Sequence, residues 1–128
     1  MILLLDTSTP ECRLVFVDGD LQFEKTWEAG RGLAKGLLEF LDTQLASQGK
    51  AWTDVRALVA YKGPGSFTGL RIGITVLNTL AYANNLPIVG ETGDDWCEKG
   101  VKRLNANEND EIVLPEYGGE ANITQPRK

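Results

Sequence analysis

The sequence predicts an α/β fold built on one mixed, five-stranded sheet with helices packed against it. Three observations support this fold class. The first 27 residues contain three short apolar or alternating runs separated by turn signals, which is the pattern of antiparallel strands. Two longer stretches follow in which apolar residues recur three and four apart, which is the period of a helix. A short apolar run follows each predicted helix, as expected for parallel βαβ units.

The N-terminal third is predicted to form an antiparallel meander. Residues 2–6 are an apolar run that ends in a carboxylate, and Pro10 then breaks the chain. Residues 13–17 and 21–27 are the next two strands, joined by the hairpin signal Asp18-Gly19-Asp20.

The first predicted helix runs from about residue 33 to residue 48 and stops at Gly49. Its apolar residues spread over an arc of roughly 160° at about 100° per residue. That arc is wider than the roughly 100° stripe of a helix that lies on one surface. The residues on it are Leu33, Leu37, Leu38, Phe40, Leu41 and Leu45.

The remaining elements follow in alternation. Residues 55–61 are continuously apolar, which is typical of an interior parallel strand. A second helix is expected over residues 68–84, and residues 88–89 form the fifth strand. We assign residues 1–92 to a core lobe. Residues 93–128 are expected to be a polar loop, with a candidate extra strand at 111–117 and a loose C-terminal tail.

The predicted order β-β-β-α-β-α-β is that of a ribonuclease-H-like half-domain, the ASKHA unit also found in actin and sugar kinases. Its βαβ crossovers are expected to be right-handed. This fold carries many unrelated functions, so function has to be argued from particular residues.

Composition excludes several kinds of chemistry. The 128 residues carry a net charge of -5, which does not favour unaided binding to nucleic acid. The absence of histidine excludes Ser-His-Asp and Cys-His nucleophile pairs and imidazole metal sites. Cys12 and Cys97 are too few for a disulfide framework, and the apolar run at residues 2–5 is too short for a signal peptide. We therefore expect a cytoplasmic protein with reduced thiols, no membrane association, no cofactor and no metal.

The stretch GPGSFTGLRIG, residues 63–73, has the glycine content of a phosphate loop but not its spacing. A Walker loop needs a lysine after its last glycine, and a dinucleotide loop needs glycines at other intervals. A structural interpretation fits better. Gly63-Pro64-Gly65 turns the chain out of the fourth strand, and Ser66 or Thr68 caps the next helix. Gly69 and Gly73 then expose helix backbone to a close neighbour.

The second helix has two apolar faces. One consists of Leu70, Ile74, Leu77 and Ala81 and is expected to meet the sheet; the other consists of Ile72, Val76, Leu80 and Ala83 and also carries the two glycines. A helix that is apolar on two sides must be covered on two sides. The cover is either the first helix or a second protein. The predicted partner interface comprises Leu38, Leu41, Leu45, Gly69, Arg71, Ile72, Gly73, Val76, Leu80 and Ala83. Arg71 either binds a carboxylate across that contact or is solvated or paired within the chain.

Three segments of the chain resemble the bacterial TsaB family, also called YeaZ. They are ILLLDTST at the N-terminus, DVRALVAYKGPGSFTGLRIG at residues 54–73 and LPIVGET at residues 86–92. The resemblance covers about the first 92 residues. It marks Gly63, Pro64, Gly65, Ser66, Phe67 and Thr68 as the family's motif loop.

The resemblance implies a non-catalytic relative of the enzyme that places a threonylcarbamoyl group on a tRNA adenosine. Such proteins bind the catalytic subunit TsaD through two helices, act with the ATPase TsaE, reach tRNA only indirectly, and form homodimers when alone. The family usually has a second half-domain, so the resemblance implies a short form without the second lobe, either a natural miniature or an engineered fragment. VLPEYGGEANI, residues 113–123, faintly resembles the family's C-terminal end.

Two alternatives belong to other functional classes. Asp6 ends the first strand where related kinases hold Mg²⁺ and phosphate, so a nucleotide-binding half-domain is one alternative. A magnesium-dependent nuclease of the ribonuclease-H type is the other, with Asp6 and Glu39 as its acids, although the fourth strand ends in Ala60-Tyr61-Lys62 without one. The structural interpretation is that Asp6, Thr7 and Ser8 satisfy backbone groups of a turn; a relic contact of Asp6 to TsaD or its nucleotide is a further option.

Two other groups of residues receive structural interpretations. Trp27, Trp52 and Trp96 are interpreted as packing residues. Asp94, Asp95, Glu108 and Asp110 are expected to lie in a solvated loop.

Overall fold

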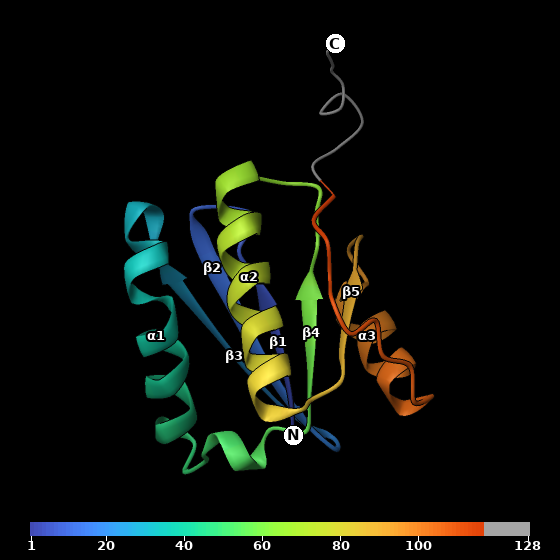
Figure 1. The fold of residues 1–128 in the computed structure, drawn as a ribbon. Coiled ribbons are helices and arrows are strands. Elements are labelled where there is room, and N and C mark those ends of the chain that lie inside the picture. The colour runs from blue at the N-terminus through green and yellow to red at the C-terminus, as the bar shows by residue number, and fades with distance from the viewer. Residues whose placement is uncertain (117–128) are drawn as a thin grey trace.

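Five strands form one mixed sheet in the order β3-β2-β1-β4-β5 (Figure 1). The computed structural model describes residues 1–116. The central strand β1 pairs antiparallel with β2 and parallel with β4. This architecture confirms the predicted fold class. The strands are β1 (Ile2–Asp6), β2 (Glu11–Asp18), β3 (Leu21–Glu28), β4 (Ala57–Tyr61) and β5 (Ile88–Glu91).

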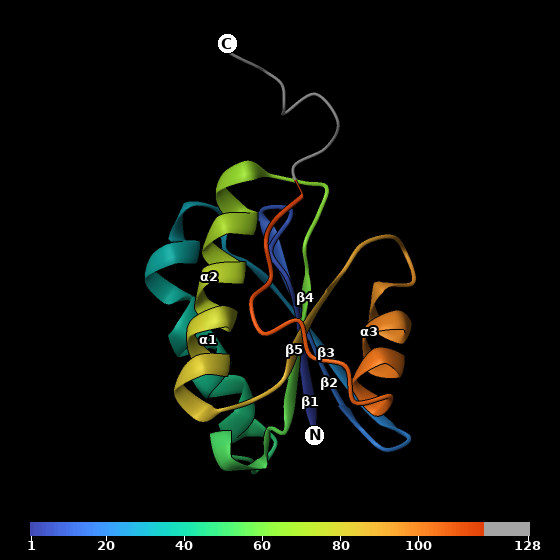
Figure 2. The same ribbon diagram turned by 45° about the vertical axis from the view of Figure 1, so that its right-hand side comes forward.

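Helices cover the two faces of the sheet unequally, as Figure 2 shows with the sheet nearly edge-on. Helices α1 (Leu33–Ser47) and α2 (Phe67–Asn84) lie side by side on one face. Helix α3 (Trp96–Asn105) lies on the other face, against β4 and β5. Short 3-10 turns at Gly30–Gly32 and Trp52–Asp54 flank α1. No helix within residues 1–116 combines the length and the hydropathy that a membrane crossing requires.

The period-two alternation of β1 divides the apolar core into two layers. Leu3 and Leu5 point toward α1 and α2, where they join the larger buried cluster. Ile2 and Leu4 point the other way and pack with Trp96 of α3. Because both faces of β1 are buried, its sequence is continuously apolar instead of alternating.

The prediction of a polar loop over residues 93–110 was wrong, because part of that segment forms α3. Only Trp96, Gly100 and Leu104 of this helix are buried. A Cβ at Gly100 would collide with Val59, so the glycine lets the helix backbone lie directly on β4. Partly buried Cys97 and Val101 pack beside these residues, so the helix does have an apolar face at helical spacing. It was missed because charged residues make the segment polar overall.

The predicted extra strand was also not found within residues 111–116; residue 117 and the predicted loose tail lie outside the described part of the chain. Residues 109–116 instead form an irregular segment, here called the strap, on the α2 side of β5 (Figure 2). The Asp110 N–H donates to the Ile88 carbonyl at 2.8 Å, and the Ile88 N–H donates to the Asn109 side chain at 3.0 Å. The strap therefore bonds the outer backbone groups of β5 without adding a regular strand.

Candidate protein-binding surface

The glycine-rich loop connects β4 to α2. Gly63 has a φ of +121°, which favours glycine, and the Gly63–Pro64 peptide bond is cis. The Ser66 hydroxyl accepts a hydrogen bond from the Gly69 N–H at 3.3 Å, which confirms the predicted helix cap. At the other end of α2, Asn85 adopts the left-handed conformation and stops the helix.

The turn after β1 fills the space beside the glycines. The Ser66 N–H donates to the Ser8 carbonyl at 2.8 Å, and the Thr7 hydroxyl donates to the Gly69 carbonyl at 2.7 Å. A Cβ would collide with Ser8 if placed at Gly65, and with Thr7 if placed at Gly69 or Gly73. The expectation that Gly69 and Gly73 open toward another protein was therefore wrong. Their close neighbour is the protein's own Thr7–Ser8 turn.

Asp6 has a structural role in the same turn. Its carboxylate accepts a hydrogen bond from the Ser8 N–H at 2.8 Å, which agrees with the predicted turn-stabilising role. Glu39, the second acid of the nuclease alternative, is exposed on α1. Within residues 1–116, histidine, cysteine, aspartate and glutamate side chains form no group of three or more that could hold a metal ion.

The two faces of α2 differ in burial as the sequence predicts. Leu70, Ile74, Leu77 and Ala81 are buried against the sheet. On the other face, Ile72, Val76 and Leu80 are half-buried against the same cluster that contains the core residues of α1, and Ala83 is exposed. The first helix therefore supplies part of the cover that the second face needs, and part of that face stays open.

The predicted interface residues of α1 separate into two groups. Leu41 and Leu45 are buried in the core at 0% and 2% exposure, so they are not available to a partner. Leu38 is 50% exposed, and it lies one turn after Ala34, which lines the groove between the helices.

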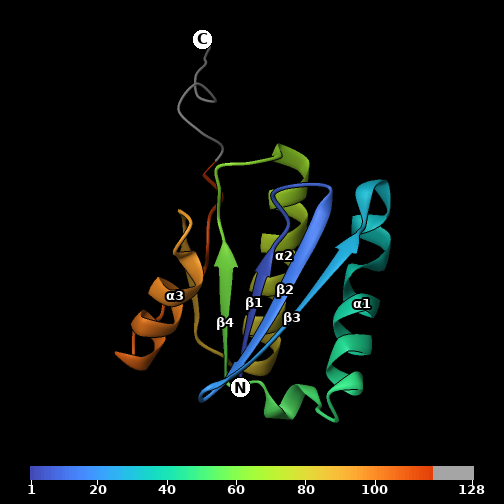
Figure 3. The ribbon, with the colours of Figure 1, turned by 180° about the vertical axis from the view of Figure 1, so that it is seen from behind.

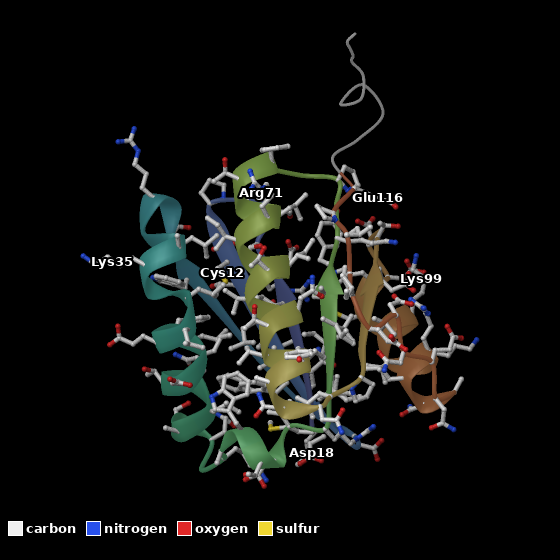
Figure 4. The ribbon with its side chains drawn as sticks, in the orientation of Figure 1. Cys12, Asp18, Lys35, Arg71, Lys99 and Glu116 are labelled. Carbon is white, nitrogen blue, oxygen red and sulfur yellow. The ribbon has the colours of Figure 1, made fainter. Side chains whose placement is uncertain are left out.

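A groove of about 360 Å³ runs between α1 and α2 on the outside of the molecule. Its lining residues are Ala34, Thr68, Arg71, Ile72, Thr75 and Val76; together with Leu38 we call them the helical face. Arg71, labelled in Figure 4, is exposed and lies over the Phe67 ring at 5.5 Å. Among the described residues no carboxylate pairs with it, so its intrachain contact is a cation–π contact and not an ion pair.

Arg103 on α3 is the centre of an ion-pair network that sequence reasoning missed. Its guanidinium donates to Glu91 at 3.1 Å, to Glu108 at 2.6 Å and to Asp110. Burial alone would raise the pKa of Asp110, but hydrogen bonds from Arg103 and from the Gly90 N–H hold that pKa below its usual value. Glu108 and Asp110 therefore form ion pairs with Arg103 of α3. The expectation that they lie in a solvated loop was wrong. Asp95 also forms an ion pair, with Lys99 at 3.3 Å.

The three tryptophans are packing residues, as predicted. Trp27 stacks on Phe40 with the ring centroids 5.0 Å apart. Trp96 is buried, and its ring packs edge-on against the ring of Tyr61. The indole N–H of Trp52 donates to the Asp42 carboxylate at 2.6 Å.

Comparisons with known proteins place this arrangement in a family. The family model described as "TsaD: tRNA N6-adenosine threonylcarbamoyltransferase" matches residues 27–92, which include α1, α2 and the glycine-rich loop. The TsaB protein of Escherichia coli is 37% identical over 107 residues, which cover 81% of this chain and 45% of that protein. The TsaB protein of Haemophilus influenzae is 35% identical over 88 residues, which cover 69% of this chain and 37% of that protein.

A solved structure gives the same result in three dimensions. YeaZ from Pseudomonas aeruginosa superposes with a TM-score of 0.67 at 30% identity, covering 77% of this chain and 49% of that one. The chain thus spans less than half the length of these two curated relatives.

Proposed function

The chain belongs to the TsaB (YeaZ) family, and from that membership we propose that it is a non-catalytic subunit in tRNA threonylcarbamoyladenosine biosynthesis. In this proposal it binds the catalytic subunit TsaD through the helical face and stabilises the active arrangement of TsaD. It meets TsaE and tRNA only through TsaD, and it works in the cytoplasm.

The observation that carries the proposal is the partly open helical face. Leu38, Ile72 and Val76 keep apolar surface accessible beside small threonine and alanine side chains. Apolar surface of this kind, rimmed by polar residues, is typical of protein contacts. Arg71 adds an exposed guanidinium, which a carboxylate on the partner can bind in a bidentate manner.

The similarity to the TsaD family model supports the choice of partner. The matched residues 27–92 contain both helices of the helical face, so the partner is expected to present helices of the same kind. The two helices of this chain can then pack against the two corresponding helices of a related lobe. Two copies of this chain can pack against each other in the same way. This is why we expect a homodimer in the absence of TsaD.

The lack of histidine in the chain supports a division of labour in which catalysis belongs to TsaD. Accordingly, the protein alone should neither hydrolyse ATP nor cleave RNA when Mg²⁺ is added. Adding it to TsaD, TsaE, tRNA and the threonylcarbamoyl donor should raise the rate of tRNA modification.

The sharpest test places a charge on the helical face. Leu38→Asp and Ile72→Asp should each weaken binding to TsaD from the same organism by at least about 10- to 100-fold, because the contact would remove water from a carboxylate without giving it a partner. Thr43→Asp is the matched control, since Thr43 is exposed on the side of α1 away from α2. Calorimetric titration measures the affinities, and a sizing column reports the homodimer. Equal affinities for all three variants would refute the assignment of this surface.

A further inference from the structure

The outer edge of β3 is the largest unpaired stretch of regular backbone in the described part of the molecule. β3 is the last strand of the sheet, and Figure 3 shows it from behind at the end of the sheet away from β5. The opposite edge is treated differently, because the strap and Arg103 bond the outward N–H and carbonyl groups of Ile88 and Gly90. One edge of the sheet is therefore closed and the other is open.

The hairpin geometry fixes which backbone groups point outward. The turn Gly19-Asp20 has two residues, so Asp18 and Leu21 form the hydrogen-bonded pair that closes the hairpin. Odd-numbered residues of β3 consequently bond to β2. The N–H and carbonyl groups that point away from the sheet belong to Gln22, Glu24, Thr26 and Glu28. No group within residues 1–116 bonds to them.

The two sides of this open edge have different chemistry. Toward α1, Phe23 stacks on Phe16 at 5.8 Å and Trp27 stacks on Phe40. Both β3 rings are half-buried, and the exposed Lys25 lies between them on the same side. The other side carries Glu24 and Glu28. Arg13 holds Glu24 in place by two hydrogen bonds, of 2.6 and 3.2 Å, and the hydrogen bond from Arg13 lowers the pKa of that carboxyl.

A second copy of the chain fits this edge poorly. A twofold axis pairs β3 with its copy in the antiparallel direction and keeps each side chain on its own face. The register over residues 21–27 then places Glu24 opposite the copy's Glu24, and the register over 22–28 places Lys25 opposite Lys25. Like charges directly opposite each other destabilise a strand pair, so the edge disfavours self-association.

We propose that the β3 edge binds an extended segment of another protein, which adds to the sheet as a sixth strand. Apolar side chains of that segment lie on the α1 side, beside Phe23 and Trp27. Basic side chains alternate with them and face Glu24 and Glu28. Backbone hydrogen bonds supply affinity in this mode of recognition, and the alternating side chains supply specificity. The edge is separate from the helical face, so this proposal does not rest on binding to TsaD.

A peptide titration tests the proposal. The probe is an acetylated and amidated peptide of alternating lysine and valine, as long as β3, and the control peptide has the same composition with its lysines and valines in separate blocks. We expect a dissociation constant below about 1 mM for the alternating peptide and at least about tenfold weaker binding of the control. Amide hydrogen exchange should slow for Gln22, Glu24 and Thr26, whose N–H groups point outward, and not for Phe23 and Lys25.

Two variants separate strand addition from simple charge attraction. Thr26→Pro removes one outward N–H and no bond of the β2–β3 ladder, so it should abolish binding, while the matched Thr26→Val should retain it. Glu28→Lys should weaken binding whether or not the proline variant folds. Equal binding of the two peptides, no binding at 1 mM, or unchanged exchange at the three outward amides would each overturn the proposal. Ile72→Asp should leave peptide binding unchanged.

Discussion

At the residue scale, the glycine motif could be located from the sequence, but its neighbour could not. Its spacing excluded a phosphate loop, and Ser66 was a correct choice for the helix cap. What approaches Gly69 and Gly73 is Thr7, which is more than sixty positions earlier in the chain. A glycine within a helix indicates that another group approaches the helix backbone closely. Only the folded structure shows which group that is.

Gly73→Ala should therefore destabilise the protein by about 1–3 kcal/mol, because the new Cβ collides with the Thr7 side chain. The collision outweighs the gain of about 1 kcal/mol in helix propensity that alanine brings. Gly32→Ala is the control, since a Cβ there meets nothing within 4 Å, and it should change stability by less than about 0.5 kcal/mol. Urea unfolding measures both variants.

A double-mutant cycle assigns the cause of that loss. Thr7→Ala removes the atoms with which the new Cβ collides, so Gly73→Ala should cost less in a Thr7→Ala background than in the parent. If its cost were the same in both backgrounds, the close contact with Thr7 would not be the reason for the glycine.

At the element scale, prediction succeeded where an element is apolar throughout and failed where charged residues dominate its sequence. Strand β1 was predicted at its observed bounds because both of its faces are buried in apolar clusters. Helix α3 was missed because charged residues make its sequence polar overall, although Trp96, Cys97, Val101 and Leu104 form an apolar face. The strap was predicted in part as a strand, yet side chains such as Asn109 and Asp110 provide bonds to β5 that a regular strand makes with its backbone.

Val113 is the residue that anchors the strap. It is 3% exposed, and both of its backbone groups bond to the Asn78 side chain at 2.9 Å. A Cβ at Gly90 would collide with its methyl groups, so Val113 packs directly on the β5 backbone. These contacts join the strap to α2 and to β5 at one point.

Val113→Ala should destabilise the protein by about 1–3 kcal/mol and speed the amide exchange of Ile88 and Gly90, which the strap covers. Its neighbour Leu114 is 72% exposed, so Leu114→Ala should change stability by less than about 0.5 kcal/mol. The two variants remove similar apolar groups a single position apart. Equal losses would show that the strap does not depend on the buried contact of Val113.

At the scale of the whole molecule, one lobe buries apolar residues on both faces of its sheet, although the chain matches less than half the length of two curated relatives. Sequence patterns were sufficient for the order of the elements along the chain from β1 to β5 and for the buried face of α2. They were not sufficient for the interface, because Leu41 and Leu45 belong to the same apolar arc as Leu38. Which of these leucines stays accessible to a partner depends on how closely α2 packs against α1. The spacing of apolar residues along α1 does not contain that information.

The buried thiol of Cys12 and the half-buried thiol of Cys97 make the stability of the whole molecule sensitive to alkaline pH. Burial raises the pKa of Cys12 to about 12, with a further contribution from Asp6. Burial likewise raises the pKa of Cys97 to about 11, against a lowering effect of Arg13. In the unfolded chain both thiols ionise near pH 9. Above that pH the unfolded state binds fewer protons than the folded state, so the free energy of unfolding must fall as pH rises.

The expected slope is up to about 1.4 kcal/mol per pH unit for each thiol, beginning near pH 9 and ending as the pH approaches the pKa of the folded state. Urea unfolding at several pH values from 8 to 11 and constant ionic strength measures it. Cys12→Ala and Cys97→Ala should each flatten the curve relative to the parent, even if the alanine lowers stability at neutral pH. The other side chains are common to the parent and both variants, so only the contribution of the replaced thiol differs between the curves. Parallel curves for the parent and both variants would mean that the thiols ionise as readily in the folded protein as in the unfolded chain, and the two-layered core around them would then be accessible to water.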